Sequence, residues 1–295
     1  MIMRAELVLD SRADLGEGPC WDHYRKRLIW VDINGFTLNL FDPVTGQNDA
    51  HRFDRHIGAA VPDDQGGFLL ALKDGFYSWH PNTDELTCIA CPEGVDTPNR
   101  FNDGKCDPEG RFWAGTMFHQ QGPKANAHLF RLDSDLSVHT MKRHVTISNG
   151  IAWDIEKQFM YYIDTLAKKV VAFDYDRNTG NISGERDAVL IPDKYGLADG
   201  MTIDEEGMLW IAFFNGWCVR RINPQTGEVL LTIDVPVAKV TSCAFGGEKL
   251  DELYITTAKA DLSPADLDKQ PFAGGLFCVK PGVKGCRAKP FAFNP

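Results

Sequence analysis

Four side chains that carry oxygen atoms stand in short phrases of one kind. They are Glu17 in GEGPCWD, Asn102 in FNDGKCD, Asn149 in SNGIAWD and Asp199 in ADGMTID. Two carboxylates and two amides, without histidine or cysteine, are the donors that a hard divalent cation prefers. If the fold brings them to one point, the carboxylates would repel each other unless a cation lies between them. These residues therefore predict a metal site.

An internal repeat places the four side chains in equivalent positions. Each copy has an acidic or turn residue, a short turn and an apolar run that often contains Trp or Tyr, and each candidate precedes its turn acid by the same interval. The copies start at Asp22, Asp63, Asp107, Asp154 and Asp204, with a degenerate sixth at Gly246. The spacing of about 40–50 residues is typical of propeller blades.

A second turn, rich in Asp, Pro, Asn and Gly, follows each copy. These turns lie at 41–47, 80–86, 131–137, 175–181, 222–228 and 279–285. Such residues supply the backbone angles of hairpin turns, so each unit is predicted to be strand, turn, strand, loop, strand, turn, strand. Six strand pairs spread over sandwich domains are the alternative, but no linker-like composition divides the chain.

The repeat predicts an all-β fold, a six-bladed β-propeller with four antiparallel strands per blade, as a single domain over residues 1–295. Equivalent positions in the blades point in equivalent directions. The four candidate side chains should therefore converge on the central axis and form a central metal site. The segment AELVLD at 5–10 could close the ring by adding a strand to the last blade.

Composition excludes several classes of protein. The net charge of -10 would be repelled by nucleic acid and by anionic membranes, so neither is an expected partner. No apolar run is long enough for a secretory signal or a membrane span, and we expect a cytoplasmic protein whose eight cysteines are reduced. Cys88 and Cys91 form one CxxC without a second pair, which favours ordinary thiols over a zinc site.

Longer phrases resemble the family of regucalcin (senescence marker protein 30), gluconolactonase and luciferin-regenerating enzyme. They include LGEGPCWD, NRFNDGKCDPEGRFWAGTM, ISNGIAWD, DGMTIDEEGMLWIA, VTSCAFGG and QPFAGGLF. The likeness follows the chain in order over nearly its whole length. It implies a six-bladed propeller with one divalent metal in the central channel and hydrolysis of sugar lactones as the usual activity.

Position by position, the resemblance implies that Glu17, Asn149 and Asp199 are the metal ligands. It also implies that Arg100 and Asn102 orient the substrate. Gln120 stands where animal regucalcins have an acidic residue that touches substrate, so it is expected to contact substrate here and to alter sugar preference. Asp199 is the expected general base, because a ligand carboxylate can also accept a proton from water.

Two neighbouring residues, Asp103 and His119, are weaker candidates for a part in the site. Side chains alternate along a strand, so Asp103 should not point the same way as Asn102, and we expect it to support the site from behind or to shape the turn. His119 lies in FHQQGPKANA, a loop that could act as a lid over the channel, although a solvated loop histidine is favoured.

The resulting prediction is a metal-dependent hydrolase that opens aldonolactones with one divalent cation: calcium, zinc, magnesium, manganese or iron. A small sugar lactone is the expected partner, and a monomer or weak homodimer is the expected assembly. A non-catalytic calcium-binding regulator, as animal regucalcins are also described, a phosphotriesterase-like hydrolase and a protein-interaction propeller are the alternatives. Three or four ligands would leave the coordination sphere open, which favours catalysis over calcium buffering.

Overall fold

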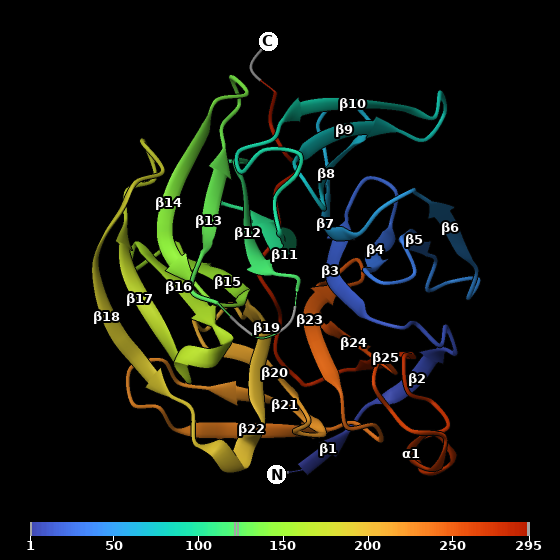
Figure 1. Ribbon diagram of the computed structural model, residues 1–295. Coiled ribbons are helices and arrows are strands. Elements are labelled where there is room, and N and C mark those ends of the chain that lie inside the picture. The colour runs from blue at the N-terminus through green and yellow to red at the C-terminus, as the bar shows by residue number, and fades with distance from the viewer. Residues whose placement is uncertain (1, 121, 123, 294–295) are drawn as a thin grey trace.

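The protein forms six β-sheets around a central axis (Figure 1). The computed structural model describes residues 2–120, 122 and 124–293. Each sheet is one blade with four antiparallel strands. In the first five blades these four strands are consecutive in the sequence, and in the sixth the N-terminal segment supplies one of them. The predicted all-β, six-bladed propeller with four antiparallel strands per blade is therefore confirmed.

The first three blades follow one another along the chain. Blade 1 contains β3 (Gly16–Asp22), β4 (Arg27–Asp32), β5 (Thr37–Phe41) and β6 (Asn48–Arg52). Blade 2 contains β7 (Ile57–Pro62), β8 (Phe68–Leu72), β9 (Phe76–His80) and β10 (Glu85–Ala90). Blade 3 contains β11 (Asn99–Cys106), β12 (Phe112–Phe118), β13 (Ala127–Leu132) and β14 (Val138–Val145).

The last three blades continue this order. Blade 4 contains β15 (Ser148–Asp154), β16 (Phe159–Asp164), β17 (Lys169–Tyr175) and β18 (Ile182–Leu190). Blade 5 contains β19 (Leu197–Ile203), β20 (Leu209–Phe214), β21 (Cys218–Ile222) and β22 (Val229–Asp234). Blade 6 contains β23 (Val240–Gly246), β24 (Glu252–Thr257), β25 (Leu276–Val279) and, from the N-terminal segment, β2 (Glu6–Leu9).

Helices are few and short. They are η1 (Thr165–Ala167), η2 (Asp193–Tyr195) and α1 (Pro264–Lys269). Within the residues that the structure describes, none is long and apolar enough to cross a membrane.

The N-terminal segment closes the ring. Strand β2 pairs antiparallel with β25, as expected for the segment 5–10, and β1 (Ile2–Arg4) pairs parallel with β22 as a fifth strand of blade 5. The expectation that the turn at 279–285 leads into another strand of blade 6 is wrong, because β2 already occupies the free edge of β25. Residues beyond β25 instead run as a tail that bridges Gly285 to Asp204 and Phe291 to Asp63.

The inner strands β3, β7, β11, β15, β19 and β23 surround the axis, and β23 contacts β3 to complete the circle (Figure 1). Apolar side chains fill each interface between neighbouring blades, giving six hydrophobic clusters among the described residues. Bulky β-formers such as Trp113 and Tyr162 are fully buried between blades 3 and 4. Burial of such side chains accounts for the aromatic runs of the repeat.

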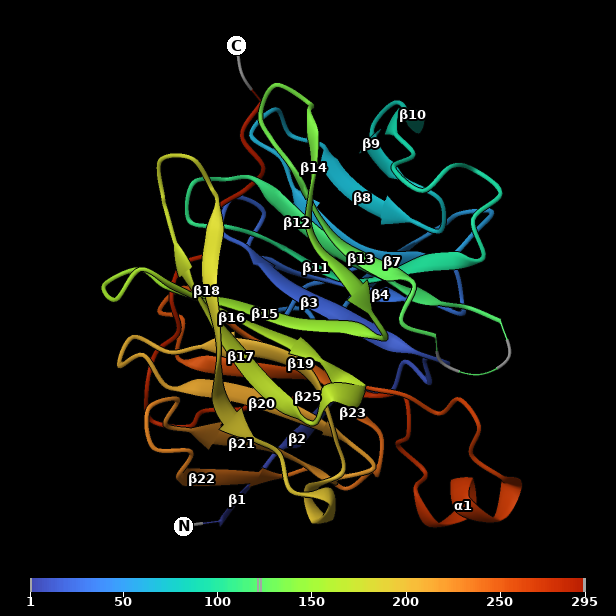
Figure 2. The same cartoon turned by 60° about the vertical axis from the view of Figure 1, so that its left-hand side comes forward.

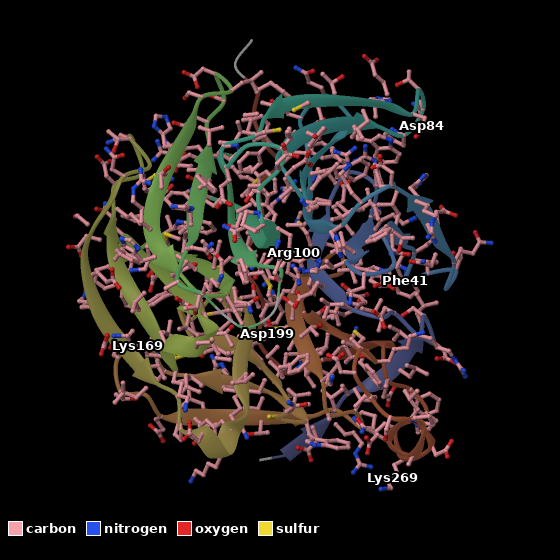
Figure 3. All side chains as sticks on the ribbon, viewed as in Figure 1. Phe41, Asp84, Arg100, Lys169, Asp199 and Lys269 are labelled. Atoms are coloured by element: carbon pink, nitrogen blue, oxygen red, sulfur yellow. The ribbon has the colours of Figure 1, made fainter. Side chains whose placement is uncertain are left out.

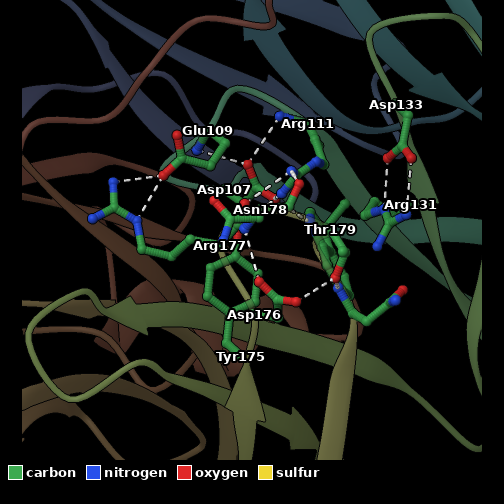
Figure 4. Close-up of polar contacts among 12 residues, drawn as sticks. Asp107, Glu109, Arg111, Arg131, Asp133, Tyr175, Asp176, Arg177, Asn178 and Thr179 are labelled. Carbon is green, nitrogen blue, oxygen red and sulfur yellow. Dashed lines mark hydrogen bonds and ion pairs between the residues drawn. The ribbon is translucent and has the colours of Figure 1, made fainter.

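The repeated turn acid stabilises the turn at the outer end of the inner strands of blades 1 to 5. In blade 3, Asp107 accepts the backbone N–H groups of Glu109 and Arg111 through Oδ1. Its Oδ2 accepts from Trp113 Nε1 at 3.1 Å and from the Tyr175 hydroxyl of blade 4 at 2.7 Å (Figure 4). The acid is therefore a structural element that joins two blades, and the channel site lies at the opposite end of the inner strands.

Candidate active site

A β-bulge interrupts the pairing of each inner strand close to its first residues. Register shifts separate Glu17 from Cys20, Phe101 from Gly104, Ser148 from Ile151 and Ala198 from Met201. Bulges re-aim side chains relative to a regular strand. Asn102, Asn149 and Asp199 lie within these irregular segments, and Glu17 lies at the start of one.

The same irregularity occurs in blades 2 and 6, but there it carries different residues. Gly58 lies within the shift of β7 and has no side chain to contribute. Thr241 lies within the shift of β23, and its hydroxyl donates to the carbonyl oxygen of Gly16 at 2.5 Å. The repeat therefore delivers oxygen-bearing side chains to the channel from four of its six equivalent positions.

Glu17 and Asp199 form a pair of buried carboxyl groups on the axis. The Asp199 carboxyl lies within hydrogen-bonding reach of Glu17 and of the Asn149 amide. Burial raises the pKa of Glu17 well above its ordinary value, and the charges of Asp199 and Asp103 raise it further. Burial and the charge of Asp103 raise the pKa of Asp199 in the same way. Two buried carboxylates in contact are unfavourable without a cation to neutralise them.

A chain of hydrogen bonds holds the amides beside this pair. Asn102 Nδ2 donates to the backbone oxygen of Ser148 at 2.8 Å and to Asn149 Oδ1 at 3.2 Å. Asn149 Nδ2 donates to Thr165 Oγ1 at 2.8 Å, and Thr165 in turn donates to the carbonyl oxygen of Ala198. Because the Asn149 Nδ2 atom donates to Thr165, its Oδ1 atom is the one that accepts from Asn102.

Arg100 contributes a cation to the channel (Figure 3 labels it together with Asp199). Its side chain is only 5% exposed, and its Nη1 atom donates to Phe101 O and to Asn102 Oδ1 at 2.7 Å. Burial lowers the pKa of Arg100 to about 10, although the charges of Glu17 and Asp199 act in the opposite direction. Its buried Nε atom has no hydrogen-bond partner among the described residues. A donor of this kind is available to a ligand.

Asp103 lies in the bulge of β11, is buried, and acts through its charge on both Glu17 and Asp199, which is compatible with the expected supporting role. It accepts the N–H of Gly104 at 2.7 Å. Lys105 reaches into the channel and donates to the carbonyl oxygen of Met201.

Gln120 and His119 lie on the loop that follows β12. Both are exposed, and the His119 N–H donates to the carbonyl oxygen of Pro98 at 3.0 Å. The contact of Gln120 with substrate stays a prediction. The His119 ring packs against His56 of blade 2, with ring centroids 4.5 Å apart. His56 was not identified from the sequence, since it lies outside the repeated phrases.

The donor set fits a hard divalent cation. Glu17 and Asp199 supply two carboxylates in contact, Asn149 supplies an oriented amide oxygen, and no soft ligand stands among them. Across the described ranges, no three His, Cys, Asp or Glu side chains are grouped as a metal site. The proposed ligand set contains only two carboxylates, and its other oxygens come from amides, so it is smaller than a group of three such side chains. The central metal ion remains a prediction.

Comparison with known proteins supports the family suggested by the phrases. Residues 15–259 match the SMP-30/Gluconolactonase/LRE-like region. The chain is 42% identical over 290 residues to a Bacillus subtilis (strain 168) protein named as a candidate sugar lactone lactonase, YvrE, covering 98% of this chain and 99% of that protein. It is 40% identical over 288 residues to regucalcin of Danio rerio, covering 96% of each.

A solved structure shows the same likeness in three dimensions. The luciferin-regenerating enzyme superimposes with a TM-score of 0.92 at 32% identity, over 98% of this chain and 99% of that one. These matches cover nearly the whole chain, and the family match over residues 15–259 spans the inner strands of all six blades. The chain belongs to the SMP-30/gluconolactonase/LRE-like family.

Proposed function

We propose that the protein is a metal-dependent hydrolase that opens sugar lactones to the corresponding acids. The observation that carries this proposal is the buried Glu17–Asp199 pair, which faces an arginine with a free donor in the same channel. Family membership and the lactonase name of the Bacillus subtilis relative support the general activity. The metal dependence and the substrate are parts of the proposal.

Glu17, Asn149 and Asp199 would hold the cation. A bound divalent cation supplies polarisation of a carbonyl oxygen and a lowered pKa for water. The protein's own part is to keep the three donors in place: the Gly18 N–H fixes the Glu17 Oε2 atom at 2.9 Å, and Thr165 fixes the amide of Asn149. Because these ligands come from three blades, the site forms only when the ring is closed.

Asp199 would accept the proton of the attacking water at a carboxylate oxygen. The burial that raises its pKa makes the carboxylate a stronger base than an exposed aspartate. Arg100 and Asn102 would bind hydroxyl groups or the ring oxygen of the sugar, since the Arg100 Nε atom still lacks a partner. This pairing would orient the lactone toward the water.

A hydrolysis screen of neutral aldonolactones tests the proposal. The protein is stripped of metal with a chelator, and calcium, magnesium, manganese, zinc and iron(II) are added back one at a time while acid release is followed with a pH indicator. Turnover that returns with at least one metal supports the proposal. Absence of turnover with every metal and every lactone overturns it.

Calcium binding without catalysis is the second candidate function. The oxygen donors at Glu17, Asn149 and Asp199 suit calcium, and the relative from Danio rerio carries the name regucalcin. Calorimetric titration with calcium separates the two functions when it is combined with the screen. Tight calcium binding together with inert lactones would favour this candidate.

A further inference from the structure

Basic side chains gather near the first residues of the inner strands of blades 2 and 3, where the charges of His119, Arg100 and Lys73 act on His56. His56 directly precedes β7, Lys73 lies in the turn between β8 and β9, Arg100 lies in β11 and His119 follows β12. The loop after β12 projects from the same side of the molecule as α1 in Figure 2. We call His56, Lys73, Arg100 and His119 the cationic mouth.

The two histidines form one packed unit. Their ring centroids lie 4.5 Å apart in an edge-to-face arrangement, and Phe36 of blade 1 packs against His56 at 4.8 Å. Burial, together with the charges of His119, Arg100 and Lys73, lowers the pKa of His56 to about 4. Burial, Arg100 and Lys73 also lower the pKa of His119. Both imidazoles are therefore neutral near pH 7 and stand in a positive field.

The charges of Glu17 and Asp199 act on Arg100, but Lys73, the other permanent cation of the mouth, is not paired with an acid among the described residues. Lys73 Nζ donates to the carbonyl oxygen of Thr97 at 3.2 Å and forms no ion pair with any residue that the structure describes. The neighbouring acids are occupied elsewhere. Asp54 and Asp74 pair with Arg55, and Glu93 pairs with His128.

The carboxylates deeper in the channel do not supply the missing partner. Glu17, Asp103 and Asp199 lie around the axis, where a bound divalent cation, Arg100 and Lys105 would balance them. That balance leaves Lys73 and the positive field at the histidines without a counter-charge from the protein. A ligand that bears its own negative charge would supply it.

We propose that the cationic mouth selects sugar lactones that carry an anionic group, a carboxylate or a phosphate, remote from the lactone carbonyl. Lys73 supplies a charge to this group, the neutral rings of His56 and His119 can donate N–H groups to it, and Arg100 holds the sugar between it and the reacting ester. Gln120, next to His119, adds no negative charge that would repel it. The inference rests on the proposed lactonase function and names its substrate class.

Matched pairs of substrates test this selection. Glucono-1,4-lactone and glucaro-1,4-lactone differ by one carboxylate, and glucono-1,5-lactone and its 6-phosphate differ by one phosphate. With the metal-loaded protein, we expect kcat/KM for at least one anionic member to exceed that of its neutral partner by about tenfold or more, as one charge-assisted contact allows. The pair that shows the preference identifies the anion. Equal or faster turnover of both neutral lactones overturns the inference but leaves the proposed function standing.

Variants connect the preference to the mouth. Lys73→Met should reduce the anionic-to-neutral ratio of kcat/KM by about tenfold, because it removes one charge from the recognition of the anion. Lys249→Met is the control, since Lys249 is an exposed lysine in the turn after β23, at the opposite end of the blade. An equal loss on both members of a pair in Lys73→Met would contradict the inference. If no lactone of either kind is opened, the proposed function itself fails.

Discussion

Asn102 Nδ2 donates to Asn149 Oδ1 over 3.2 Å, and this bond joins the inner strands of blades 3 and 4 beside the buried carboxylates. It occupies one lone pair of the oxygen proposed to bind metal and leaves the other for the cation. The Asn102 side chain also accepts a hydrogen bond from Arg100 at its Oδ1 atom. The residue proposed to orient substrate and the residue proposed to hold metal are therefore parts of one hydrogen-bonded unit.

Substitution of Asn102 should disturb both functions at once. Asn102→Ala leaves Arg100 Nη1 without one acceptor and Asn149 Oδ1 without its donor. We expect metal affinity to fall by about tenfold, as for other residues that orient ligands, and KM for lactone to rise. Calorimetry and steady-state kinetics measure the two effects.

Asn48→Ala provides the matched control for this variant. Asn48 lies on the outer strand β6, where its amide donates to Asn39 Oδ1 at 2.9 Å. Its loss removes a comparable amide pair far from the channel and should cost stability without changing metal affinity or KM. Unchanged metal affinity and KM in Asn102→Ala would show that the bond does not position the site.

Removal of one buried carboxylate should stabilise the metal-free protein while it abolishes activity. Glu17→Gln keeps the shape of the side chain and removes the repulsion with Asp199 and Asp103 that raises the pKa of Glu17. In chelator, we expect Tm to rise by about 2–4 °C for each kcal/mol gained. Thermal unfolding checks this, with the exposed Glu156→Gln as control. A lower Tm in chelator would mean that Glu17 is stabilised by contacts other than a cation.

Metal should stabilise the folded protein through the same pair. A cation that binds only the native state at about 100 times its Kd adds about 2.7 kcal/mol to the free energy of unfolding. Asp199→Asn should lose most of this increment, because Asp199 supplies one of the two carboxylates. The comparison requires urea unfolding of both proteins with chelator and with metal. An increment of the same size in Asp199→Asn would place the stabilising cation elsewhere.

The sequence was sufficient to predict the blades and the main channel residues because both follow from repetition. Turn acids such as Asp107 recur with a strand pair after each, and in four of the six blades the residue five positions earlier is one of the oxygen-bearing side chains proposed for the channel. The bulge that contains Asp103 could not be predicted, because it depends on how inner strands pack around the axis, which no local pattern encodes. Lys73 and His56 were missed because they lie in blade 2 outside the repeated phrases, and they come near Arg100 and His119 of blade 3 only in the folded ring.

The His56–His119 contact predicts sensitivity to mild acid. The folded pKa of His56, about 4, lies below its ordinary value of 6.5, so the unfolded chain binds more protons between these pH values. The stability contribution of the neutral ring is therefore full above about pH 6.5 and is lost as pH falls toward 4. His56→Gln should show a smaller loss of unfolding free energy between pH 7 and 5 than the parent protein.

Urea unfolding at the two pH values measures this difference, with His80→Gln as the control at the outer end of β9. The half-buried position of His56 makes the effect modest, since solvent screens part of the charge. An equal pH dependence in His56→Gln and the parent would show that other groups dominate acid sensitivity.

The turn acid of blade 3 should matter for stability and not for chemistry. Asp107→Ala removes a buried carboxylate that pairs with Arg111 at 3.1 Å and accepts from Trp113 and Tyr175, leaving all three without their partner (Figure 4). Breaking a buried pair in this way costs about 3–5 kcal/mol.

Tyr175→Phe removes a single bond to the same carboxylate and should cost about 1.5–3 kcal/mol. Urea unfolding gives both values, and kcat/KM of the folded variants should stay at the parent level because Asp107 lies at the opposite end of β11 from Arg100. A selective loss of kcat/KM in Tyr175→Phe would instead show that the blade 3–blade 4 contact is coupled to the channel.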